Sequence, residues 1–508
     1  MNQFLRIQLG SAARGQNLAQ YLARAGYPIH ADCGGKGKCG KCRVKLFSGV
    51  LFEDPECTHA AKPDQDGRYY ACRVYCGHDS CVLLPQIEGE GLTDFAGQSN
   101  AKGAECNHAA LGIALDIGTT TLAAALVNRQ DGSMINSASA LNPQSAFGAD
   151  VISRIEHVMR HPDSLSTMQA VLLDKIRELL QRLAPDKAIG HMVVAGNPTM
   201  LHIFCGISPV SMGSYPFTPV FTESRTLAGK DLCLPVDTVT LLPSISAFVG
   251  GDITSGMLHC SLTQSEHPTL LVDVGTNGEC VLFTGTAHQN RLYAASAAAG
   301  PAMEGAGIST GMGGVSGAVC AFRLQGTVPV CSTVDDTPAQ GICGSGLIDL
   351  VSALYGTGVI DETGAFEHGE QYTYATTGEG LPLTLTQADI RALQLSKSAI
   401  RACIEALCAR AGLTTQDIEC IYLAGGFGYY MNTDSAIAIG LLPANFKDRT
   451  VCIGNASLGG CVRVLCDASL LDGMRADADR CQTLELSTDT IWNEAFMEHM
   501  TFPFEDEI

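Results

Sequence analysis

The sequence predicts a mixed α/β protein with a small cysteine-rich N-terminal domain and a larger body made of two similar halves. Three observations support this prediction. Three cysteines stand close together among glycines near the N-terminus. An apolar run that ends in Asp-x-Gly-Thr occurs twice, at residues 111–121 and 270–279. Helical and strand patterns follow each of these segments in the same order, as an internal duplication predicts.

Length and charge restrict the possible classes of function. At 508 residues the chain is long enough for about three domains, each with its own core. The net charge of −20 argues against nucleic acid as a main partner, because no basic surface would displace counterions. Residues 1–88 alone carry 11 Lys and Arg against 8 Asp and Glu. This segment is therefore weakly basic, in contrast to the acidic remainder of the chain, which indicates a separate unit. The sequence has no signal-peptide pattern and no run of 18 apolar residues, which predicts a cytoplasmic protein without a membrane span.

The N-terminal segment combines strand and helix patterns with a metal-binding motif. Residues 2–9 alternate as a strand does, and residues 17–25 have the apolar spacing of a short helix. Three thiols follow at Cys33, Cys39 and Cys42. The glycines between them allow the backbone to curl round a cluster and to aim N–H groups at sulfur. A fourth thiol, Cys72, comes after 29 intervening residues, on a predicted strand.

Four thiolates can hold an iron–sulfur cluster or a zinc ion. The C-x5-C-x2-C…C spacing resembles that of [2Fe–2S] ferredoxins of the plant or adrenodoxin type. Zinc is the alternative, although a zinc ribbon usually has two C-x2-C pairs and this segment has one. Cys76 is the alternative to Cys72 as fourth ligand, and the Ala-Cys-Arg context favours Cys72. Most cysteines after residue 106 stand singly in apolar runs and are expected to be buried free thiols.

Residues 88–109 are predicted to be a linker. They are rich in Gly, Ala, Ser, Asn and acidic residues and show no apolar period. A flexible chain of this length has a span of roughly 25 Å, enough for the N-terminal domain to move between two docking positions. A passive tether is the alternative. The predicted domains are therefore residues 1–87, 110–262 and 263–508.

The two Asp-x-Gly-Thr segments are predicted to be strand–turn–strand hairpins that bind phosphate. Glycine in the turn leaves room for backbone N–H groups to approach a phosphate, and threonine adds hydroxyl donors. The donors of the first hairpin are Gly118, Thr119, Thr120 and Thr121, and those of the second are Gly275, Thr276 and Asn277. Asp116 and Asp273, at the strand ends, can hold Mg²⁺ directly or through water. Two such hairpins that face each other would clamp one nucleotide.

The remaining elements of the two halves follow the same order. In the first half we expect helices at residues 151–159 and 168–183 and strands at 191–195 and 239–242. In the second half we expect helices at 347–355, 390–411 and 455–471 and strands at 421–424 and 451–453. The second half is longer, so it carries insertions.

Three motifs in this order resemble those of one superfamily. DIGTTT, DVGTNGE and AGGFG are similar to the first phosphate, second phosphate and adenosine motifs of the acetate and sugar kinase, heat-shock cognate and actin superfamily. Together with the ferredoxin pattern, the whole chain resembles the reductive activators of corrinoid proteins in anaerobes. Residues 297–314, 341–350 and 423–432 are similar to the same family. The resemblance implies a β-grasp ferredoxin-like domain and a two-lobed actin-like ATPase with ribonuclease H-like halves.

The resemblance also implies an activity and its cofactors. One electron would pass from a [2Fe–2S] cluster on Cys33, Cys39, Cys42 and Cys72 to the inactive Co(II) corrinoid of a partner protein, which restores Co(I). ATP and Mg²⁺ would occupy the cleft, and an upstream low-potential donor would reduce the cluster again. Asp116 and Asp273 would hold Mg²⁺ or the attacking water, while Gly425, Gly426 and Phe427 would lie along the adenosine. Glu304 would orient water or contact the partner, or else stabilise its loop. The family also allows a homodimer.

One departure and three rival interpretations accompany this resemblance. Longer members carry a middle domain between linker and ATPase body, and no room for one exists between Ile87 and Leu111. The nearest rival is the activator of 2-hydroxyacyl-CoA dehydratases, in which two subunits share one [4Fe–4S] cluster. The second is a small-molecule kinase with a fused redox domain. The third is a ferredoxin on an actin-like scaffold that binds nucleotide without doing work.

Overall fold

The computed structural model divides the chain into two compact units, Met1–Ala101 and Lys102–Ile508. It describes residues 4–9, 13–24, 43–64, 67–77, 80–85, 110–148, 150–185, 189–305, 307–314, 316–425 and 431–504. The predicted linker lies outside the described residues, as do five predicted site residues: Cys33, Cys39, Cys42, Gly426 and Phe427. Their assigned roles therefore stay predictions.

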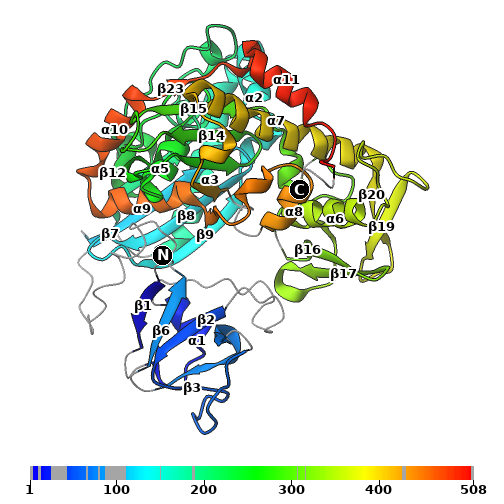
Figure 1. Cartoon of the computed structure of the whole chain (residues 1–508). Coiled ribbons are helices and arrows are strands. Elements are labelled where there is room, and N and C mark those ends of the chain that lie inside the picture. The colour runs from blue at the N-terminus through cyan, green and yellow to red at the C-terminus, as the bar shows by residue number, and fades with distance from the viewer. Residues whose placement is uncertain are drawn as a thin grey trace. The chain divides into compact units, whose positions relative to one another are not determined.

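The N-terminal unit contains a four-stranded antiparallel sheet and one helix (Figure 1). The strand order is β1 (Phe4–Gln8), β6 (Cys81–Pro85), β2 (Arg43–Ser48) and β4 (Arg68–Tyr70). The short strands β3 (Leu51–Phe52) and β5 (Tyr75–Cys76) form a separate pair. Helix α1 (Leu18–Arg24) buries Leu18 and Leu22 in the same core as Val44 and Val82. The strand and the helix predicted at the N-terminus are confirmed.

Cys72 does not lie on a strand, contrary to the sequence prediction. It lies in a single turn of 3-10 helix, η2 (Ala71–Arg73), and the side-chain amide of Asn17 donates to its carbonyl oxygen at 2.9 Å. The chain has to turn here because β4 pairs with β2 in one sheet and β5 pairs with β3 in another. The change of sheet thus overrides the strand pattern of the surrounding aromatic and β-branched residues.

The first half of the body is a six-stranded mixed sheet. Its strand order is β11 (Arg225–Ala228), β12 (Val236–Leu241), β10 (Ile189–Gly196), β7 (Leu111–Ile117), β8 (Thr121–Asn128) and β9 (Met134–Leu141). Strands β7, β8 and β9 form antiparallel hairpins, whereas β10 and β12 run parallel to β7. The helices are α2 (Val151–Arg160), α3 (Ser164–Leu183), α4 (Pro198–Phe204) and α5 (Gly251–His259). The predicted strands and helices of this half are confirmed.

The second half repeats this topology. Its main sheet has the order β22 (Thr450–Gly454), β21 (Cys420–Ala424), β13 (Thr269–Val274), β14 (Gly278–Phe283), β15 (Leu292–Ala297) and β23 (Gln482–Thr483). Again the first three strands in sequence form antiparallel hairpins, and the next two lie parallel to the first on its other side. Because the same connectivity occurs twice, the predicted duplication is confirmed.

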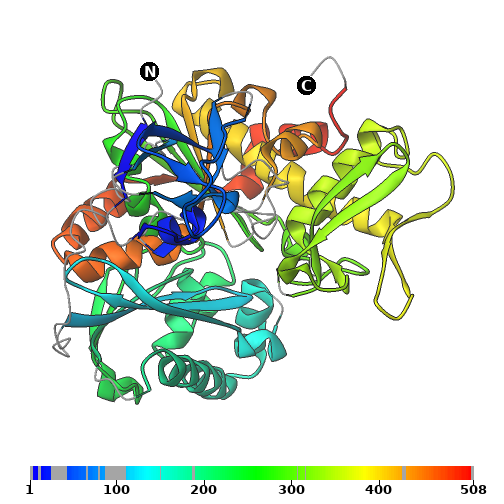
Figure 2. The same cartoon turned by 90° about the horizontal axis from the view of Figure 1, so that it is seen from below.

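The insertions of the second half form additional small sheets. They contain β16 (Ala318–Gln325), β17 (Val328–Thr333), β18 (Gly341–Ile342), β19 (Gln371–Thr376) and β20 (Pro382–Thr386). Figure 2 shows β16, β17, β19 and β20 in yellow-green and yellow, on one side of the body. Helix α6 (Gly344–Gly356) lies between β18 and β19 in the chain, and α7 (Gln387–Ala411) follows β20. No helix in the described part of the chain is long and apolar enough to cross a membrane.

Two helices are exchanged between the halves. Helix α5 ends the first half, but its Ile253 and Met257 share a core with Leu271 and Val281 of the second sheet. Helix α9 (Ala456–Cys466) ends the second half, but its Val464 shares a core with residues of the first sheet. The exchange ties the two halves together, because each sheet is covered by a helix from the other.

The helix predicted at residues 455–471 is divided into two. Helix α9 ends at Cys466, and α10 (Leu470–Arg480) begins four residues later. The Asp467 carboxylate accepts hydrogen bonds from the backbone N–H of Ser469 at 3.0 Å and from its hydroxyl at 2.6 Å. Asp and Ser favour such local turns over the helix interior, which explains the break.

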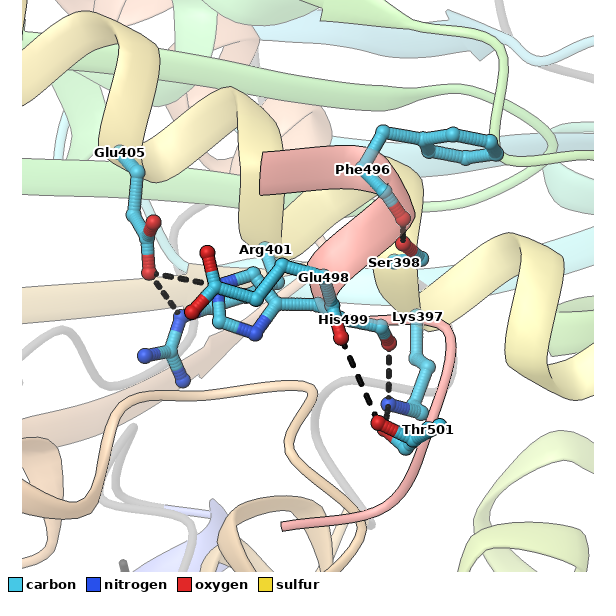
Figure 3. Close-up of polar contacts among 8 residues, drawn as sticks. All are labelled: Lys397, Ser398, Arg401, Glu405, Phe496, Glu498, His499 and Thr501. Atoms are coloured by element: carbon cyan, nitrogen blue, oxygen red, sulfur yellow. Dashed lines mark hydrogen bonds and ion pairs between the residues drawn. The ribbon is translucent and has the colours of Figure 1, made fainter. Parts of the chain in front are cut away.

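The C-terminal segment lies along α7 and buries a lysine (Figure 3). Lys397 is fully buried, and its ammonium donates to the carbonyl oxygens of His499 and Thr501, at 2.6 Å each. About two turns further along α7, Glu405 accepts from Arg401 at 2.7 Å and contacts the His499 ring at 2.8 Å. Burial and the nearby Arg401 lower the pKa of Lys397 to about 7. These contacts fasten α11 (Thr490–Glu498) and the residues after it to the second half.

This burial predicts a pH-dependent stability. Between pH 7 and 9 the unfolded chain holds the Lys397 proton and the folded chain releases it, so stability rises with pH, by up to about 1.4 kcal/mol per unit. Lys397→Met should flatten this rise in the free energy of unfolding, measured by denaturant titration at pH 7, 8 and 9. The exposed Lys230→Met is the control, and it should keep the wild-type slope. Parallel profiles for wild type and Lys397→Met would contradict the prediction.

Candidate functional site

The two predicted phosphate hairpins face each other. Asp116 and Asp273 lie near the ends of β7 and β13, beside β10 and β21 respectively. Thr120 of the first hairpin and Thr276 of the second have their hydroxyl oxygens 3.4 Å apart. In the first turn the N–H of Gly118 donates to the carbonyl of Thr121 at 3.0 Å, and a Cβ on Gly118 would lie 2.5 Å from that oxygen. The two turns therefore lie next to each other, and their binding of a nucleotide stays a prediction.

Glu304 bridges the hairpins. It ends the short helix η9 (Pro301–Glu304), and its Oε2 accepts from the hydroxyls of Thr120 at 2.6 Å and Thr276 at 2.7 Å. Its Oε1 accepts from the backbone N–H of Thr276 at 3.1 Å. One carboxylate thus receives hydrogen bonds from both halves of the body.

A buried arginine supports the first hairpin from behind. Arg154 on α2 is fully buried, and its guanidinium donates to the carbonyl of Thr119 at 2.7 Å and to that of Gly148 at 3.0 Å. The amide of Asn197 donates to the Thr119 hydroxyl at 3.0 Å, and the amide of Asn142 donates to the Gly118 carbonyl at 2.8 Å. The residues that make these contacts lie outside the hairpin in the sequence. The spacing of residues within the hairpin therefore does not reveal them.

Asp116 is held by the other half of the body. The Ser457 hydroxyl donates to its Oδ1 at 2.8 Å, and the Asn455 amide donates to its Oδ2 at 3.0 Å. Asn455 also caps α9, because its Oδ1 accepts from the N–H of Leu458 at 2.7 Å. Sequence reasoning missed both residues. Their signal is an Asn-x-Ser that follows the strand after the Gly-Gly-Phe-Gly turn.

Two further carboxyl groups join the site. Asp252 comes at the start of α5 and Glu279 at the start of β14, and sequence reasoning missed both. Burial, with Asp116 nearby, raises the pKa of Asp252 to about 7. Burial and the neighbouring carboxylates raise the pKa of Asp273 to about 8. Burial also raises the pKa values of Asp116 and Glu279. Glu279 is buried and the three aspartates are half-buried, so these carboxyl groups line one partly solvated space.

The remaining predicted residues differ in their surroundings. The carbonyl oxygen of Asn277 accepts a hydrogen bond from the N–H of Gly275 at 3.0 Å, which closes the second turn. The side chain of Thr121 is exposed, and this residue contributes its carbonyl to the first turn. Gly425 has φ +110°, and a Cβ there would lie 2.3 Å from the carbonyl oxygen of Val274. Within the described residues, no three Asp, Glu, His or Cys side chains are spaced to hold a metal ion.

The two candidates for the fourth cluster ligand differ in burial. Cys76 is fully buried in the core of the N-terminal unit, and burial raises its pKa to about 12. Cys72 is half-buried at the rim of that core. A thiolate is needed to bind a metal, so this difference favours Cys72.

Three family models match successive parts of the chain. The model described as the C-terminal domain of RACo, the ASKHA domain, matches residues 267–507. The model described as the RACo middle region matches residues 111–265, and a 2Fe-2S iron-sulfur cluster binding domain matches residues 10–77. The chain belongs to the RACo family. The predicted fold class, a ferredoxin domain joined to an actin-like ATPase body, is confirmed.

Named relatives of this RACo family member extend over most of its length. "Corrinoid activation enzyme RamQ" of Eubacterium limosum is 29% identical and covers 96% of each chain. The "[Co(II) methylated amine-specific corrinoid protein] reductase" of Methanosarcina barkeri is 24% identical over 77% of each chain. The solved structure of "Reductive activator for corrinoid, iron-sulfur protein" is 27% identical, with a TM-score of 0.74, and covers 97% of this chain and 96% of the other. The sequence-based assignment to corrinoid activators is confirmed.

One expectation about the family is wrong. The sequence predicted that a middle domain is missing, because residues 88–110 leave no room for one. The RACo middle-region model instead matches residues 111–265, which form the first half of the body. This segment carries the first Asp-x-Gly-Thr motif, which is typical of the ATPase body, so the sequence offers no separate segment for a middle domain.

The contacts of Arg154 predict a linked loss of stability and nucleotide affinity. Arg154→Met should remove the arginine donor from the buried carbonyl of Thr119 and from the half-buried carbonyl of Gly148, at a cost of about 2–4 kcal/mol, and release the Thr119 turn. We expect affinity for an ATP analogue, measured by calorimetry, to fall roughly tenfold. Lys397→Met is the matched control, since it also removes a fully buried basic side chain that donates to two carbonyls, but in the C-terminal contact. Equal losses of affinity in both variants would contradict a specific role of Arg154.

The shared carboxyl space predicts a gain of stability on neutralisation. The folded pKa of Asp252 exceeds its unfolded value, so the wild type loses stability as pH rises from 4 to 7. Asp252→Asn should therefore stabilise the protein increasingly from pH 5 to 7 and constantly above, by about 1–2 kcal/mol at pH 8. Denaturant unfolding at pH 5, 6, 7 and 8 measures this difference. The exposed Asp231→Asn should show no such trend.

Proposed function

We propose that this chain is an ATP-dependent reductive activator of a corrinoid protein. When bound, the [2Fe–2S] cluster supplies one electron, which reduces Co(II) to Co(I) in the corrinoid of the partner. An upstream low-potential donor restores the cluster. The observation that carries the proposal is the combination, in one chain, of a ferredoxin domain with two hairpins that converge between the halves of an ASKHA body. The relatives named for corrinoid activation and for Co(II) corrinoid protein reduction support it.

The nucleotide would lie between the two hairpins. The N–H groups and hydroxyls around Thr119, Thr120 and Thr276 would bind its phosphates. The adenosine would lie along the turn that begins at Gly425, with Gly426 and Phe427. This arrangement gives each half of the body its own contact with the phosphates, so the nucleotide would stabilise one relative position of the halves.

The carboxyl groups of the site fit a divalent cation. Burial raises the pKa of Asp116, Asp252 and Asp273, and repulsion adds to it, because Asp116 acts on Asp252 and both of them act on Asp273. A cation would relieve this repulsion. Because the described residues lack three side chains spaced for direct binding, we propose that Mg²⁺ is held by the phosphates and water, with Asp116 and Asp273 as the nearest protein anions. One of the carboxylates would also orient the attacking water.

The cluster ligands would be Cys33, Cys39, Cys42 and Cys72. The half-buried position of Cys72, compared with the core position of Cys76, supports this choice. The hydrogen bond from Asn17 to the carbonyl of Cys72 fixes the backbone at the fourth ligand.

Hydrolysis of ATP would overcome an unfavourable electron transfer. For one electron, each 59 mV of deficit costs a factor of ten, or about 1.4 kcal/mol. Nucleotide binding can assist only if the closed body binds ATP more tightly than the open body does, and if the closed body favours the more easily reduced form of the docked corrinoid. The two hairpins, each rooted in a different half, are the elements that would make this distinction.

The test measures Co(I) formation in a corrinoid protein by its absorbance. Asp116→Asn with Asp273→Asn should reduce the ATP-dependent rate on the order of 100-fold or more, because the cation and water lose their anions. Iron content should stay at two per chain, with an unchanged electron paramagnetic resonance spectrum. Cys72→Ser should lose the cluster, whereas Cys76→Ser should keep it.

Other outcomes would favour a rival function. Four irons shared by two chains would favour the dehydratase-activator type. A phosphorylated small molecule formed without a corrinoid protein would favour a kinase. Equal cobalt reduction with and without ATP would favour a ferredoxin on a passive scaffold.

A further inference from the structure

Glu304 stands where an anion would bind both hairpins. Its Oε2 accepts from the Thr120 hydroxyl at 2.6 Å and from the Thr276 hydroxyl at 2.7 Å. Its Oε1 takes the backbone N–H of Thr276 at 3.1 Å. A single negatively charged oxygen therefore joins the two halves of the body, and charge-assisted hydrogen bonds of this length are among the stronger ones in proteins.

The donors that Glu304 occupies are those assigned to phosphate. A hydroxyl has one hydrogen, so the hydroxyls of Thr120 and Thr276 cannot donate to the carboxylate and to a phosphate at the same time. A phosphate oxygen between the hairpins would receive the same hydrogen bonds from the same side. Carboxylate and phosphate would also repel each other there. Glu304 and a phosphate at this position therefore exclude each other.

We propose that Glu304 determines the specificity of the site for the number of phosphates in the nucleotide. It holds the position of the terminal phosphate, so a nucleoside triphosphate has to displace it and a nucleoside diphosphate does not. This inference rests on the proposed nucleotide-binding function and adds a competitor that belongs to the protein. The competition lowers the affinity of the site for the triphosphate. The position of the Glu304 side chain then depends on whether a triphosphate or a diphosphate is bound.

The side chain of Glu304 can leave the threonines while its backbone stays in place. Ala302 and Met303 of the same turn are buried in the core of the second half, and a Cβ on Gly305 would lie 2.3 Å from the carbonyl oxygen of Met312, so η9 itself is held. Glu304 is only half-buried, so its carboxylate can turn away by rotation about its own side-chain bonds. On the other side of η9, a Cβ on Gly300 would contact nothing within 4 Å, so space is available there.

The segment is fastened to α7 on both sides of Glu304. The Ser396 hydroxyl donates to the carbonyl of Ala299 at 2.5 Å. The N–H of Ser309 donates to the carboxylate of Asp389 at 2.7 Å. The segment that carries Glu304 is therefore hydrogen-bonded to α7, the helix that also contacts the C-terminal segment through Lys397. The displacement of Glu304 would reach the second half of the body through these hydrogen bonds.

The test compares affinities of full-length variants by calorimetry with magnesium present. Glu304→Ala and Glu304→Gln should bind a non-hydrolysable ATP analogue roughly 5- to 20-fold more tightly than the wild type, because no charged competitor has to leave. Affinity for ADP should change less than about twofold. Glu379→Gln is the control, since it removes one negative charge from an exposed turn and should change neither affinity. Unchanged or weaker binding of the analogue, or equal tightening for ADP, would overturn the inference.

Hydrogen exchange gives a second measurement that does not depend on activity. In the wild type, peptides within residues 298–314 should exchange faster with the analogue than with ADP, because Glu304 has left the threonines. Slower exchange with the analogue would contradict the displacement. If the wild type binds neither nucleotide, the proposed function fails. If it binds both and Glu304→Ala gains nothing, only this inference fails.

Discussion

The site depends on the way in which Asp116 of the first half is held by residues of the second. Asn455 and Ser457 bind its two carboxylate oxygens, and they come from the start of α9. Helix α9 reaches this place because it covers the sheet of the first half, while α5 covers that of the second. The exchange of helices therefore brings the ends of β7 and β13 together. Without it, each hairpin would be a separate half-site.

The electrostatics of the cleft follow from this arrangement. The meeting of two strand ends places Asp116 and Asp273 in one space, and α5 adds Asp252. Burial and repulsion disfavour the ionised forms of these carboxyl groups. A bound cation would remove this unfavourable interaction. Glu304 adds another carboxylate but satisfies it with donors from both hairpins. Binding sites commonly carry such a cost in stability, because groups that suit a ligand suit one another poorly.

Much of the fold could be predicted because its signals are local. Buried strands, helix periods and the repeated Asp-x-Gly-Thr turn are readable over ten to twenty residues, and the structure agrees with them. Two predictions failed because another interaction overrides the apolar pattern, a local turn in one case and strand pairing in the other. Asp467 and Ser469 form a turn that divides the last predicted helix, and a change of sheet places Cys72 in a 3-10 turn. Apolar periodicity does not detect either feature, since neither changes the order of apolar residues.

The sequence by itself determined the order and type of the elements, the ferredoxin pattern, the duplicated halves and the two hairpin motifs, because each is written in neighbouring residues. The tertiary structure alone decided which distant groups meet. The contacts of the site join segments that are 28 to 341 positions apart in the chain. They are those of Arg154 with Thr119, of Asn455 and Ser457 with Asp116, of Asp252 with Asp116, and of Glu304 with Thr120 and Thr276. Such contacts depend on how two sheets exchange their covering helices. No spacing along the chain encodes that exchange, because it arises only when both halves pack together.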